Sequence, residues 1–289
     1  MHGVPGTFEL RKCIACSVIF TYPQLNSEKM AAYYTTSYYM GLLERNRVAS
    51  LGELSFRRRR ILRRGAKRKY DLIVDHGGHG RLLDIGCSTG EFLAGMHLLG
   101  WNDLYGVELS SVASENVERS LGIKVWNAEF PDITSMAGEK FDVINLSHSF
   151  EHFSDPVCAL GSLSDLLAPR GLCLITIPNP DSLDAAWFGA AWVGYEVPRH
   201  YFSFPPHVFR SLVESRGFQV VDERLTDNPH GAMLLNIAYA LHGTRWAALW
   251  RRVARLLSIG VVSACFIPLY KVLEAFGNVP SMTYVLRKS

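Results

Sequence analysis

The sequence predicts an α/β protein with a seven-stranded, mostly parallel sheet that is covered by helices on both faces. Short apolar segments alternate with helical segments from residue 81 to residue 177. A loop with Gly86 and Gly90 joins the first apolar segment to the helical segment after it. Hydrophobic residues make up 48% of the 289 residues, which is enough for a large core. Because strands that alternate with helices are joined by crossovers, they form a parallel sheet that is buried on both sides.

The predicted strands and helices follow one another along the whole core. Strands are expected at 81–85, 104–107, 123–126, 141–146 and 171–177, and helices between them at 92–99, 111–120 and 156–167. A helix at 207–216 precedes a sixth strand at 218–221, and a seventh strand is expected at 282–286. We also expect a helical N-terminal region and a hydrophobic helical insertion between strands six and seven. The expected domain boundaries are 1–70, 71–231, 232–278 and 279–289.

Cys13 and Cys16 form a C-x-x-C pair ahead of a short apolar segment. The pattern is similar to the second half of a zinc ribbon, as in a chain that begins midway through one. A closed structural zinc site needs four ligands, and His2 is the other nearby candidate. We favour the absence of a complete zinc site. The alternative is a site that His2 or a partner chain completes.

An aromatic cluster within residues 27–54 predicts one or two helices ahead of the core. The cluster consists of two tyrosine pairs and a leucine pair: Tyr33, Tyr34, Tyr38, Tyr39, Leu42 and Leu43. We expect it to pack across the top of the core. The alternative is a lid over a cofactor or substrate.

Residues 56–70 contain nine basic residues and no acidic one. Apolar residues at helical spacing, among them Phe56, Ile61 and Leu62, predict a helix with a cationic face. One interpretation is an ordinary solvated face. The other is contact with a phosphate-bearing substrate or an anionic membrane surface. Nucleic acid is disfavoured, because no recognition module accompanies the basic residues.

Residues 232–276 interrupt the alternation of strands and helices. Six apolar residues share one helical face: Trp246, Leu249, Trp250, Val253, Leu256 and Leu257. Arg245, Arg252 and Arg255 fall mostly on the other face. The nearly apolar segment 256–270 is too short to span a bilayer comfortably. The segment is either a helical subdomain that packs on the core or on a partner, or an interfacial membrane element.

The predicted compartment is the cytoplasm. No apolar run of sufficient length follows a basic N-terminus, so no signal peptide is expected. Of the six cysteines only the C-x-x-C pair is closely spaced, which suits a reducing environment. If the membrane interpretations hold, the protein is peripheral to the inner membrane face. The net charge of +3 is too small to imply a polyanionic partner by itself.

Asp84 ends the first predicted strand, directly before the glycine loop. A strand, a glycine loop and a helix present backbone N–H groups and a helix N-terminus to a ligand. An aspartate at this point is unusual for a pyrophosphate and suits an amine or a positive charge. Glu108 ends the second strand 24 residues later, near the offset of roughly 20 expected of a ribose-binding acid. Dehydrogenases share that acid, so Glu108 alone does not choose the cofactor.

Residues 81–218 resemble the class I S-adenosylmethionine-dependent methyltransferases, and in particular bacterial enzymes that act on quinones, sugars and other small molecules. The loop that ends at Gly90 is similar to the family's D/E-x-G-x-G-x-G motif, with Ser88 at the middle glycine. The resemblance implies a Rossmann-like sheet and S-adenosylmethionine as cofactor. Asp84 would then face the cofactor's methionine amino group, directly or through water. The loop residues expected to bind the cofactor are Asp84, Gly86, Cys87 and Gly90.

The same resemblance assigns residues after the next strands. Glu108 would bind both ribose hydroxyls, with Leu109 beside it. Asn127 and Ala128 occupy the place of the adenine contact after the third strand. His148, after the fourth strand, completes the expected cofactor-binding set.

The segment from Leu146 to Pro156 resembles the family's E-H-x-x-D-P stretch. It also contains His148-x-x-Glu151-His152, an inverted zinc-protease motif. We disfavour that interpretation, because the motif lies at a strand exit rather than on a helix, and we expect no metal.

His200 is the expected catalytic base, within a segment similar to the family's P-x-H-x-x-x-F-S element. It could instead orient its loop or cap the helix that begins near Pro205. Glu151 and His152 are the other catalytic candidates, and their alternative role is to fix the loop beneath the cofactor. Four aromatic residues are expected to line an acceptor pocket or to pack as a lid: Trp187, Phe188, Trp192 and Tyr195.

The function expected from the resemblance is methyl transfer to a small molecule, most plausibly at oxygen. The candidate acceptors are a sugar, a glycan precursor or a lipid-linked intermediate. One alternative is a sugar C-methyltransferase. Another is a non-catalytic, membrane-associated protein that keeps the cofactor-binding fold. A dehydrogenase is disfavoured by Asp84. The sequence does not specify an oligomeric state.

Overall fold

The computed structural model describes residues 6–34, 50–132, 134–225, 229–241, 244, 246–257, 265, 267–276 and 278–289. Its centre is a seven-stranded sheet with the order β5-β4-β3-β6-β7-β10-β9. The strands are β3 (Leu82–Ile85), β4 (Leu104–Glu108), β5 (Lys124–Asn127), β6 (Phe141–Ser147), β7 (Leu167–Pro178), β9 (Phe218–Arg224) and β10 (Ser281–Lys288). β10 runs antiparallel to β7 and β9, and the other strand pairs of this sheet are parallel. The predicted fold class is therefore confirmed.

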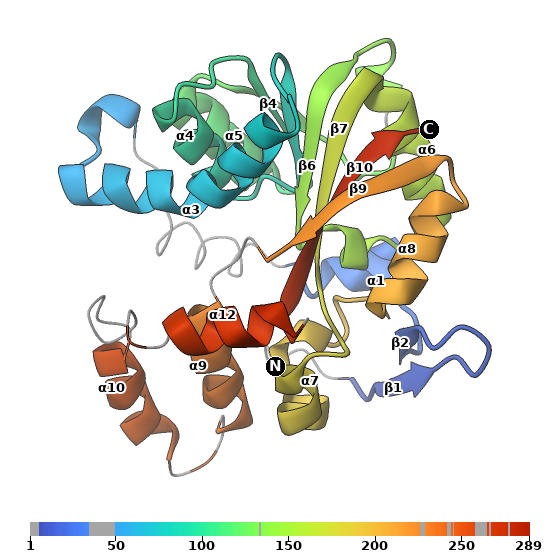
Figure 1. The fold of residues 1–289 in the computed structure, drawn as a ribbon, viewed down its shortest axis with the longest axis vertical. Coiled ribbons are helices and arrows are strands. Elements are labelled where there is room, and N and C mark those ends of the chain that lie inside the picture. The colour runs from blue at the N-terminus through green and yellow to red at the C-terminus, as the bar shows by residue number, and fades with distance from the viewer. Residues whose placement is uncertain are drawn as a thin grey trace.

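Helices cover both faces of the sheet (Figure 1). One face carries α3 (Phe56–Asp75), α4 (Glu91–Leu98) and α5 (Ser111–Leu121), and the other carries α6 (Pro156–Leu166) and α8 (Pro206–Glu214). The helix after β3 and the helix after β6 thus lie on opposite faces, although these two strands are neighbours. Such a switch point opens a crevice at the carboxyl ends of the strands, where α/β proteins bind ligands.

The central strands are apolar on both sides because both faces are covered. All four residues of β3 are buried, and Leu82 and Leu83 are completely inaccessible to solvent. One core cluster, which includes Phe141, Phe150 and Phe209, lies towards α6 and α8, and a second core lies towards α3 and α4. Burying a side chain of this size stabilises the fold by about 1.5–3 kcal/mol.

A second, three-stranded antiparallel sheet joins the N-terminal segment to the core. It consists of β1 (Glu9–Lys12), β2 (Ile19–Tyr22) and β8 (Phe202–Ser203). The short helix α1 (Ser27–Ala31) follows β2. The Thr21 hydroxyl donates a hydrogen bond to the carbonyl oxygen of His200 at 2.8 Å. Of the predicted aromatic cluster, Tyr33 and Tyr34 belong to the described part of the chain. Tyr38, Tyr39, Leu42 and Leu43 lie outside it.

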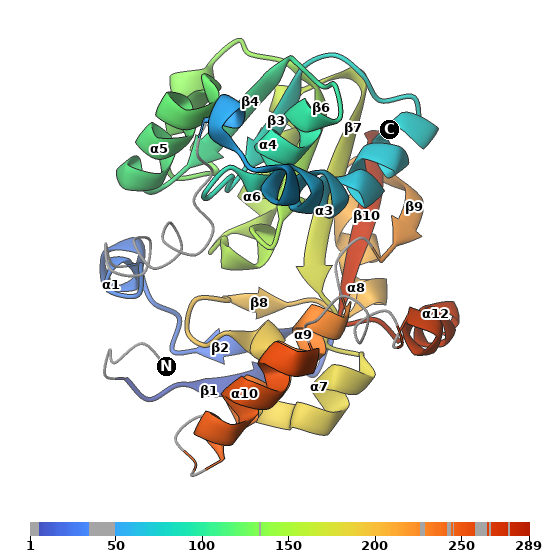
Figure 2. The same ribbon diagram turned by 90° about the vertical axis from the view of Figure 1, so that its left-hand side faces the viewer.

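The insertion between β9 and β10 is helical, as predicted. It contains α9 (Pro229–Ala240), α10 (Ala247–Leu257) and α12 (Ile267–Ala275). Below the sheet, α9 packs near α7 (Leu183–Phe188), where the Asn236 amide donates to the Asp184 carboxylate at 2.8 Å (Figure 2). Arg245 lies outside the described residues. None of the described helices combines the length and the apolar character needed to cross a bilayer.

Five single-turn helices complete the described secondary structure. They are 3-10 helices at Leu51–Glu53, Thr134–Met136, Phe150–His152, Gly189–Ala191 and Val193–Tyr195.

Candidate active site

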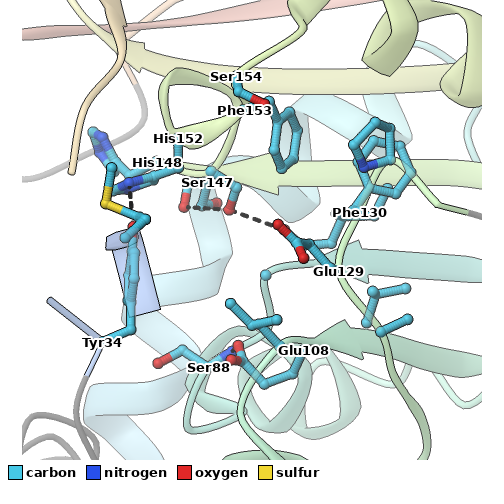
Figure 3. Close-up of a pocket in the computed structure, with 18 of the residues that line it drawn as sticks. Tyr34, Ser88, Glu108, Glu129, Phe130, Ser147, His148, His152, Phe153 and Ser154 are labelled. Atoms are coloured by element: carbon cyan, nitrogen blue, oxygen red, sulfur yellow. Dashed lines mark hydrogen bonds between the residues drawn. The ribbon is translucent and has the colours of Figure 1, made fainter. Parts of the chain in front are cut away.

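A cavity of about 470 Å³ lies at the carboxyl ends of the central strands, at the switch point of the sheet (Figure 3). Residues that follow β3, β4, β5 and β6 line it, together with residues of the N-terminal segment. The lining residues used below are Met30, Tyr34, Gly86, Ser88, Glu108, Leu109, Ala128, Glu129, Phe130, Ser147, His148, His152, Phe153 and Tyr201.

The glycine loop closes one side of the cavity. Gly86 has a φ of +76°, and a Cβ atom there would approach the Ser149 hydroxyl oxygen to 2.4 Å. Gly90 has a φ of +78° and lies directly before α4. Both positions therefore require glycine, because other residues are strained in this left-handed conformation. The loop brings backbone to the mouth of the cavity.

Glu108 links the glycine loop to the end of β4. One carboxylate oxygen accepts a hydrogen bond from the Ser88 backbone N–H at 2.8 Å, and the other accepts from the Ser110 N–H at 2.9 Å. The side chain is buried and still lines the cavity. Glu108 therefore has a fixed orientation before any ligand arrives.

Asp84 is buried and is not among the residues that line the cavity. Its carboxylate accepts a hydrogen bond from the Asn145 amide at 2.6 Å. Burial raises the pKa of Asp84 to about 7, although Asn145 and the charge of Lys69 act in the opposite direction. Cys87 is also buried, away from the lining, and burial raises the pKa of its thiol.

The end of β5 supplies a different contact from the expected one. The Asn127 amide donates to the backbone carbonyls of Glu108 and Leu109 at 2.9 and 2.8 Å. Asn127 thus ties β5 to β4 and does not line the cavity, whereas Ala128 does. Glu129 and Phe130, directly after Ala128, line the cavity too. Glu129 and Phe130 were not predicted from the sequence as site residues, although they directly follow the residues expected to contact adenine.

His148 is an exposed titratable side chain that lines the cavity. It adopts a φ of +52°, which is unusual for a residue other than glycine, and its side chain is 44% exposed. Its Nδ1 atom lies 3.3 Å from the Glu151 carboxylate, whose side chain is only 1% exposed. Burial alone would raise the pKa of Glu151, but the nearby His148 and the positive charge of His200 hold it below its ordinary value.

His152 also lines the cavity, in contact with the N-terminal segment. Its Nδ1 atom lies 2.7 Å from the Tyr34 hydroxyl and 3.1 Å from the Arg199 carbonyl oxygen. Burial and the positive charge of His200 lower the pKa of His152 to about 4. His152 is therefore neutral at physiological pH.

His200 lies behind His152 and does not line the cavity, with the two rings 4.5 Å apart. Its Nδ1 atom lies 2.8 Å from the Gly194 carbonyl, and its Nε2 atom lies 3.2 Å from the Glu196 carboxylate. Burial acts to lower the pKa of His200, but Glu196 and Glu151 raise it above its ordinary value. The structure thus places the expected base where it can orient the site rather than touch an acceptor.

Glu151, His152 and His200 each offer a donor atom within 4.8 Å of the others. A cation could use such a cluster, but two of its atoms already have partners. Nε2 of His200 faces Glu196, and Nδ1 of His152 faces Tyr34 and the Arg199 carbonyl. We assign no metal here.

Comparison with known proteins identifies the family. The model of a methyltransferase domain family matches residues 55–223, which is more than half of the chain. The chain belongs to this methyltransferase family. The resemblance to class I S-adenosylmethionine-dependent methyltransferases is therefore confirmed.

Curated relatives agree with this assignment. Two proteins named ubiquinone biosynthesis O-methyltransferase, from two strains of Cereibacter sphaeroides, are 34% and 32% identical to this methyltransferase. The matches cover 50% and 64% of this chain, and 62% and 72% of the relatives. The chain thus spans less than two thirds of the length of the first relative.

Solved structures show the same fold. A SAM-dependent methyltransferase from Archaeoglobus fulgidus superposes with a TM-score of 0.51 at 20% identity, over 80% of this chain and 94% of the other. An S-adenosylmethionine-dependent methyltransferase from Clostridium acetobutylicum superposes with a TM-score of 0.50 at 10% identity, over 89% of this chain and 99% of the other.

The residues of this methyltransferase fit S-adenosylmethionine. Glu108 offers a fixed carboxylate to the ribose hydroxyls, and the glycine loop leaves room for a ligand beside the backbone. Asp84 is buried behind the loop and does not line the cavity, so it would act on the methionine ammonium as a nearby negative charge. Next to it, the buried Oδ1 atom of Asn145 has no hydrogen-bond partner among the described residues and is a second acceptor. When bound, the cofactor supplies an electrophilic methyl group and a good leaving group.

The expected aromatic acceptor pocket is not part of this cavity. Trp187 is largely exposed, and Trp192 is buried against Tyr195 with their ring centroids 4.9 Å apart. None of the four expected aromatic residues lines the cavity. Its apolar wall comes instead from Met30, Tyr34, Phe130, Phe153 and Tyr201. Of these, Tyr34 belongs to the cluster for which the sequence suggested a lid.

Cys13 and Cys16 lie at a second cavity, of about 480 Å³, beside apolar residues such as Phe202 and Val208. Both are free thiols. Hydrogen bonds from the backbone N–H groups of Cys16 and Ala15 lower the pKa of Cys13. His2 lies outside the described residues, so the favoured absence of a complete zinc site stays a prediction, and completion by His2 stays its alternative.

Proposed function

We propose that this methyltransferase transfers the methyl group of S-adenosylmethionine to a hydroxyl oxygen of a small acceptor that carries an apolar ring or chain. The curated relatives support an oxygen acceptor, since they are named O-methyltransferases of ubiquinone biosynthesis. The aromatic and aliphatic wall of the cavity supports the apolar part of the acceptor.

The observation that carries this proposal is the pairing of His148 with buried Glu151. When Nδ1–H of His148 donates to the Glu151 carboxylate, Nε2 keeps its lone pair. This imidazole can accept the hydroxyl proton of the acceptor. The cofactor, when bound, would supply the methyl group and would leave as S-adenosylhomocysteine when its methyl–sulfur bond breaks. Glu151 stabilises the imidazolium that results. The arrangement is that of a general base held in one tautomer by a carboxylate.

His152 and Tyr34 have a different role in this proposal. Because the pKa of His152 is lowered to about 4, His152 is a poor base at neutral pH. Its bond to the Tyr34 hydroxyl joins the N-terminal segment to the rim of the cavity. We assign the pair to closing the site and excluding water from the acceptor.

Among the acceptors expected from the sequence, the cavity favours the lipid-linked class over a bare sugar. A sugar presents several hydroxyls that each need a polar partner on desolvation. The apolar part of the cavity wall includes Met30, Phe130, Phe153 and Tyr201. An acceptor with one reactive hydroxyl on an apolar body would bind against these residues at a lower desolvation cost than a sugar.

The test is methyl transfer from labelled S-adenosylmethionine to a panel of acceptors: ring hydroxyls with and without an isoprenoid chain, and nucleotide sugars. We expect O-methylated ring products. Changing His148→Ala should lower kcat by about 10²–10⁴-fold with little change in cofactor affinity, because a general base acts on the chemical step. His97→Ala, an exposed histidine in the last turn of α4, is the control and should leave kcat unchanged.

Other outcomes select the alternatives. A product methylated at carbon would establish the C-methyltransferase. Cofactor binding without transfer to any acceptor would favour a non-catalytic protein. An unchanged kcat in His148→Ala would remove His148 from the mechanism.

We also propose that an anionic membrane surface is a partner of this methyltransferase, through α3. Its arginine face is defined here as the exposed basic residues Arg57, Arg60, Arg63 and Arg64. Phe56 and Ile61 lie beside it and are 82% and 49% exposed. Cations flanked by exposed apolar side chains suit an interface with anionic lipid. Such contact would bring the enzyme to an acceptor that resides in the membrane.

A further inference from the structure

Lys69 is a cation at a core position of α3. The buried stripe of this helix consists of Leu62, Ala66, Lys69, Leu72 and Ile73. Lysine is rarely fully buried, because an ammonium loses much hydration energy on leaving water. Other basic residues of α3, such as Arg60 and Lys67, are exposed. The inward direction of Lys69 therefore calls for a reason other than packing.

The ammonium of Lys69 lies beneath the cofactor cavity. Nζ donates a hydrogen bond to the hydroxyl oxygen of Ser147, a residue that lines the cavity. It also lies 5.8 Å from the ring centroid of Phe92, in the first turn of α4. Lys69 thus reaches the end of β6 and the start of the helix that follows the glycine loop.

Close packing of α3 on α4 fixes this position. A Cβ atom at Gly95 would approach the Cβ atom of Ala66 to 2.6 Å, so the two helices nearly touch there. Ala66 lies one turn before Lys69 on the buried stripe. The backbone that carries the ammonium is therefore held in place by the core.

Lys69 is connected to Asp84 through hydrogen bonds, and its positive charge acts on the Asp84 carboxylate. Asn145 donates to the Asp84 carboxylate at 2.6 Å and to the Ser147 hydroxyl oxygen at 3.2 Å. Hydrogen bonds therefore connect Lys69 through Ser147 and Asn145 to Asp84. Within this chain Ser147 lines the cavity, and Asp84 at the far end is the carboxylate expected to face the methionine ammonium.

We propose that Lys69 is a positioning residue for the methionine end of S-adenosylmethionine, acting through Ser147 and Asp84. Its charge favours the ionised form of Asp84, and its hydrogen bond orients the Ser147 hydroxyl at the cavity wall. The inference rests on the cofactor and not on the acceptor. It would survive a failure of the proposed O-methylation.

The pH dependence of binding follows from the groups around Asp84. Burial raises the pKa of Asp84 to about 7, and the charge of Glu108 acts in the same direction. Asn145 and Lys69 lower it. The thiol of Cys87 is kept protonated by burial and by the same two carboxylates. Because the cofactor's ammonium requires ionised Asp84, binding should weaken as the pH falls below about 7. Removal of Lys69 should move that midpoint to higher pH.

The experiment compares two ligands by calorimetry between pH 6 and pH 9. S-adenosylhomocysteine carries the amino-acid end, whereas 5′-methylthioadenosine has the same nucleoside without it. In Lys69→Met, the Kd of S-adenosylhomocysteine at pH 7.5 should rise about 10-fold or more, and that of 5′-methylthioadenosine less than about twofold. Lys67→Met is the matched control. It removes an exposed lysine two residues away, which pairs with Asp71, and should change neither Kd.

Two further variants keep the test decisive if Lys69→Met does not fold. Ser147→Ala should weaken S-adenosylhomocysteine selectively, and Lys69→Arg should retain the wild-type midpoint. Equal weakening of both ligands with an unmoved midpoint would mean that Lys69 only supports the fold, and would overturn the proposal. Unchanged binding in Lys69→Met would overturn it as well. Absence of S-adenosylhomocysteine binding to the wild-type protein would instead contradict the cofactor site.

Discussion

His200 shows how one buried residue can organise the site without touching a substrate. Its Nε2 atom lies 3.2 Å from the Glu196 carboxylate and 4.0 Å from the Glu151 carboxylate, and its ring packs on His152. Charged His200 neutralises these carboxylates and also lowers the pKa of His152. The positive charge of His200 thus stabilises the Glu151 carboxylate, which lies next to His148. The same positive charge lowers the pKa of His152 and so favours its neutral form.

Replacing His200 should destabilise the protein more than it disturbs chemistry. His200→Ala leaves Glu151 buried beside one fewer positive charge, and breaking a buried ion pair costs about 3–5 kcal/mol. We expect a lower Tm, measured by circular dichroism. His97→Ala is the exposed control. An unchanged Tm together with a large loss of kcat would instead make His200 the catalytic base.

The pH dependence of stability has a sign that follows from these pKa shifts. The pKa of His200 is raised in the fold, so its contribution is fully present below the unfolded value of about 6.5 and is lost as the pH rises through the folded pKa. For Glu196, burial acts to raise the pKa, but His200 and Arg199 lower it to about 2. Its contribution is therefore present above the unfolded value of about 4.3 and is lost as the pH falls towards 2.

At the scale of elements, α3 carries its charges where they oppose the helix dipole. Its first turn contains Arg57, Arg58 and Arg59 and no acidic residue. Cations near a helix N-terminus cost about 0.3–1 kcal/mol each. Arg58 pairs with Glu91, and Arg59 donates to backbone carbonyls that include Leu54, but Arg57 is exposed. A helix selected for stability alone would carry acids here.

This conflict gives a prediction in which binding and stability move in opposite directions. The triple variant Arg57→Glu, Arg60→Glu and Arg64→Glu should lose co-sedimentation with phosphatidylglycerol vesicles. It should keep or raise its Tm, because the change at Arg57 places an acid in the first turn of α3. Arg216→Glu, an exposed arginine after α8 on the opposite side of the sheet, is the control. Equal binding of the wild-type protein and the triple variant would refute the membrane contact.

The sequence predicted elements best where the physical pattern is long and local. The alternation of apolar and helical segments from residue 81 to 177 located the five strands β3 to β7 of the central sheet. Strands that are buried on both faces are continuously apolar and are therefore easy to recognise. The three-stranded sheet was harder to foresee. β8 has only two residues, too few for any periodicity, and its partner β2 lies about 180 residues earlier in the chain. Pairings of that kind depend on tertiary structure.

The residues of the candidate site also fall into those that the local sequence predicts and those that depend on tertiary contacts. Glu108 and the glycine loop were predicted from strand ends, and they do lie together at the cavity. The burial of Asp84 and His200 was not foreseeable, because it depends on neighbours from distant segments such as Asn145 and Gly194. Lys69 was one of nine basic residues in the sequence, and only the packing of α3 separates it from the others.

At the scale of the whole molecule, three parts of the chain converge on one cavity. The central sheet supplies the glycine loop and Glu108, the β6 exit supplies His148 and His152, and the N-terminal segment supplies Tyr34. The three-stranded sheet fixes that N-terminal segment to the residues that follow His200. The cofactor and acceptor ends of the cavity are thus built from different parts of the chain.

The central claim is that this cavity holds S-adenosylmethionine with Glu108 at the ribose. The most direct measurement is calorimetric titration with S-adenosylhomocysteine and with NAD, for the wild-type protein and Glu108→Gln. The wild-type protein should bind one S-adenosylhomocysteine and no NAD. Glu108→Gln should weaken binding by about 10-fold or more, because its amide cannot accept from both the Ser88 and Ser110 N–H groups. Glu115→Gln, an exposed residue of α5, should bind as the wild-type protein does. Binding of NAD without S-adenosylhomocysteine, or full affinity in Glu108→Gln, would contradict the account.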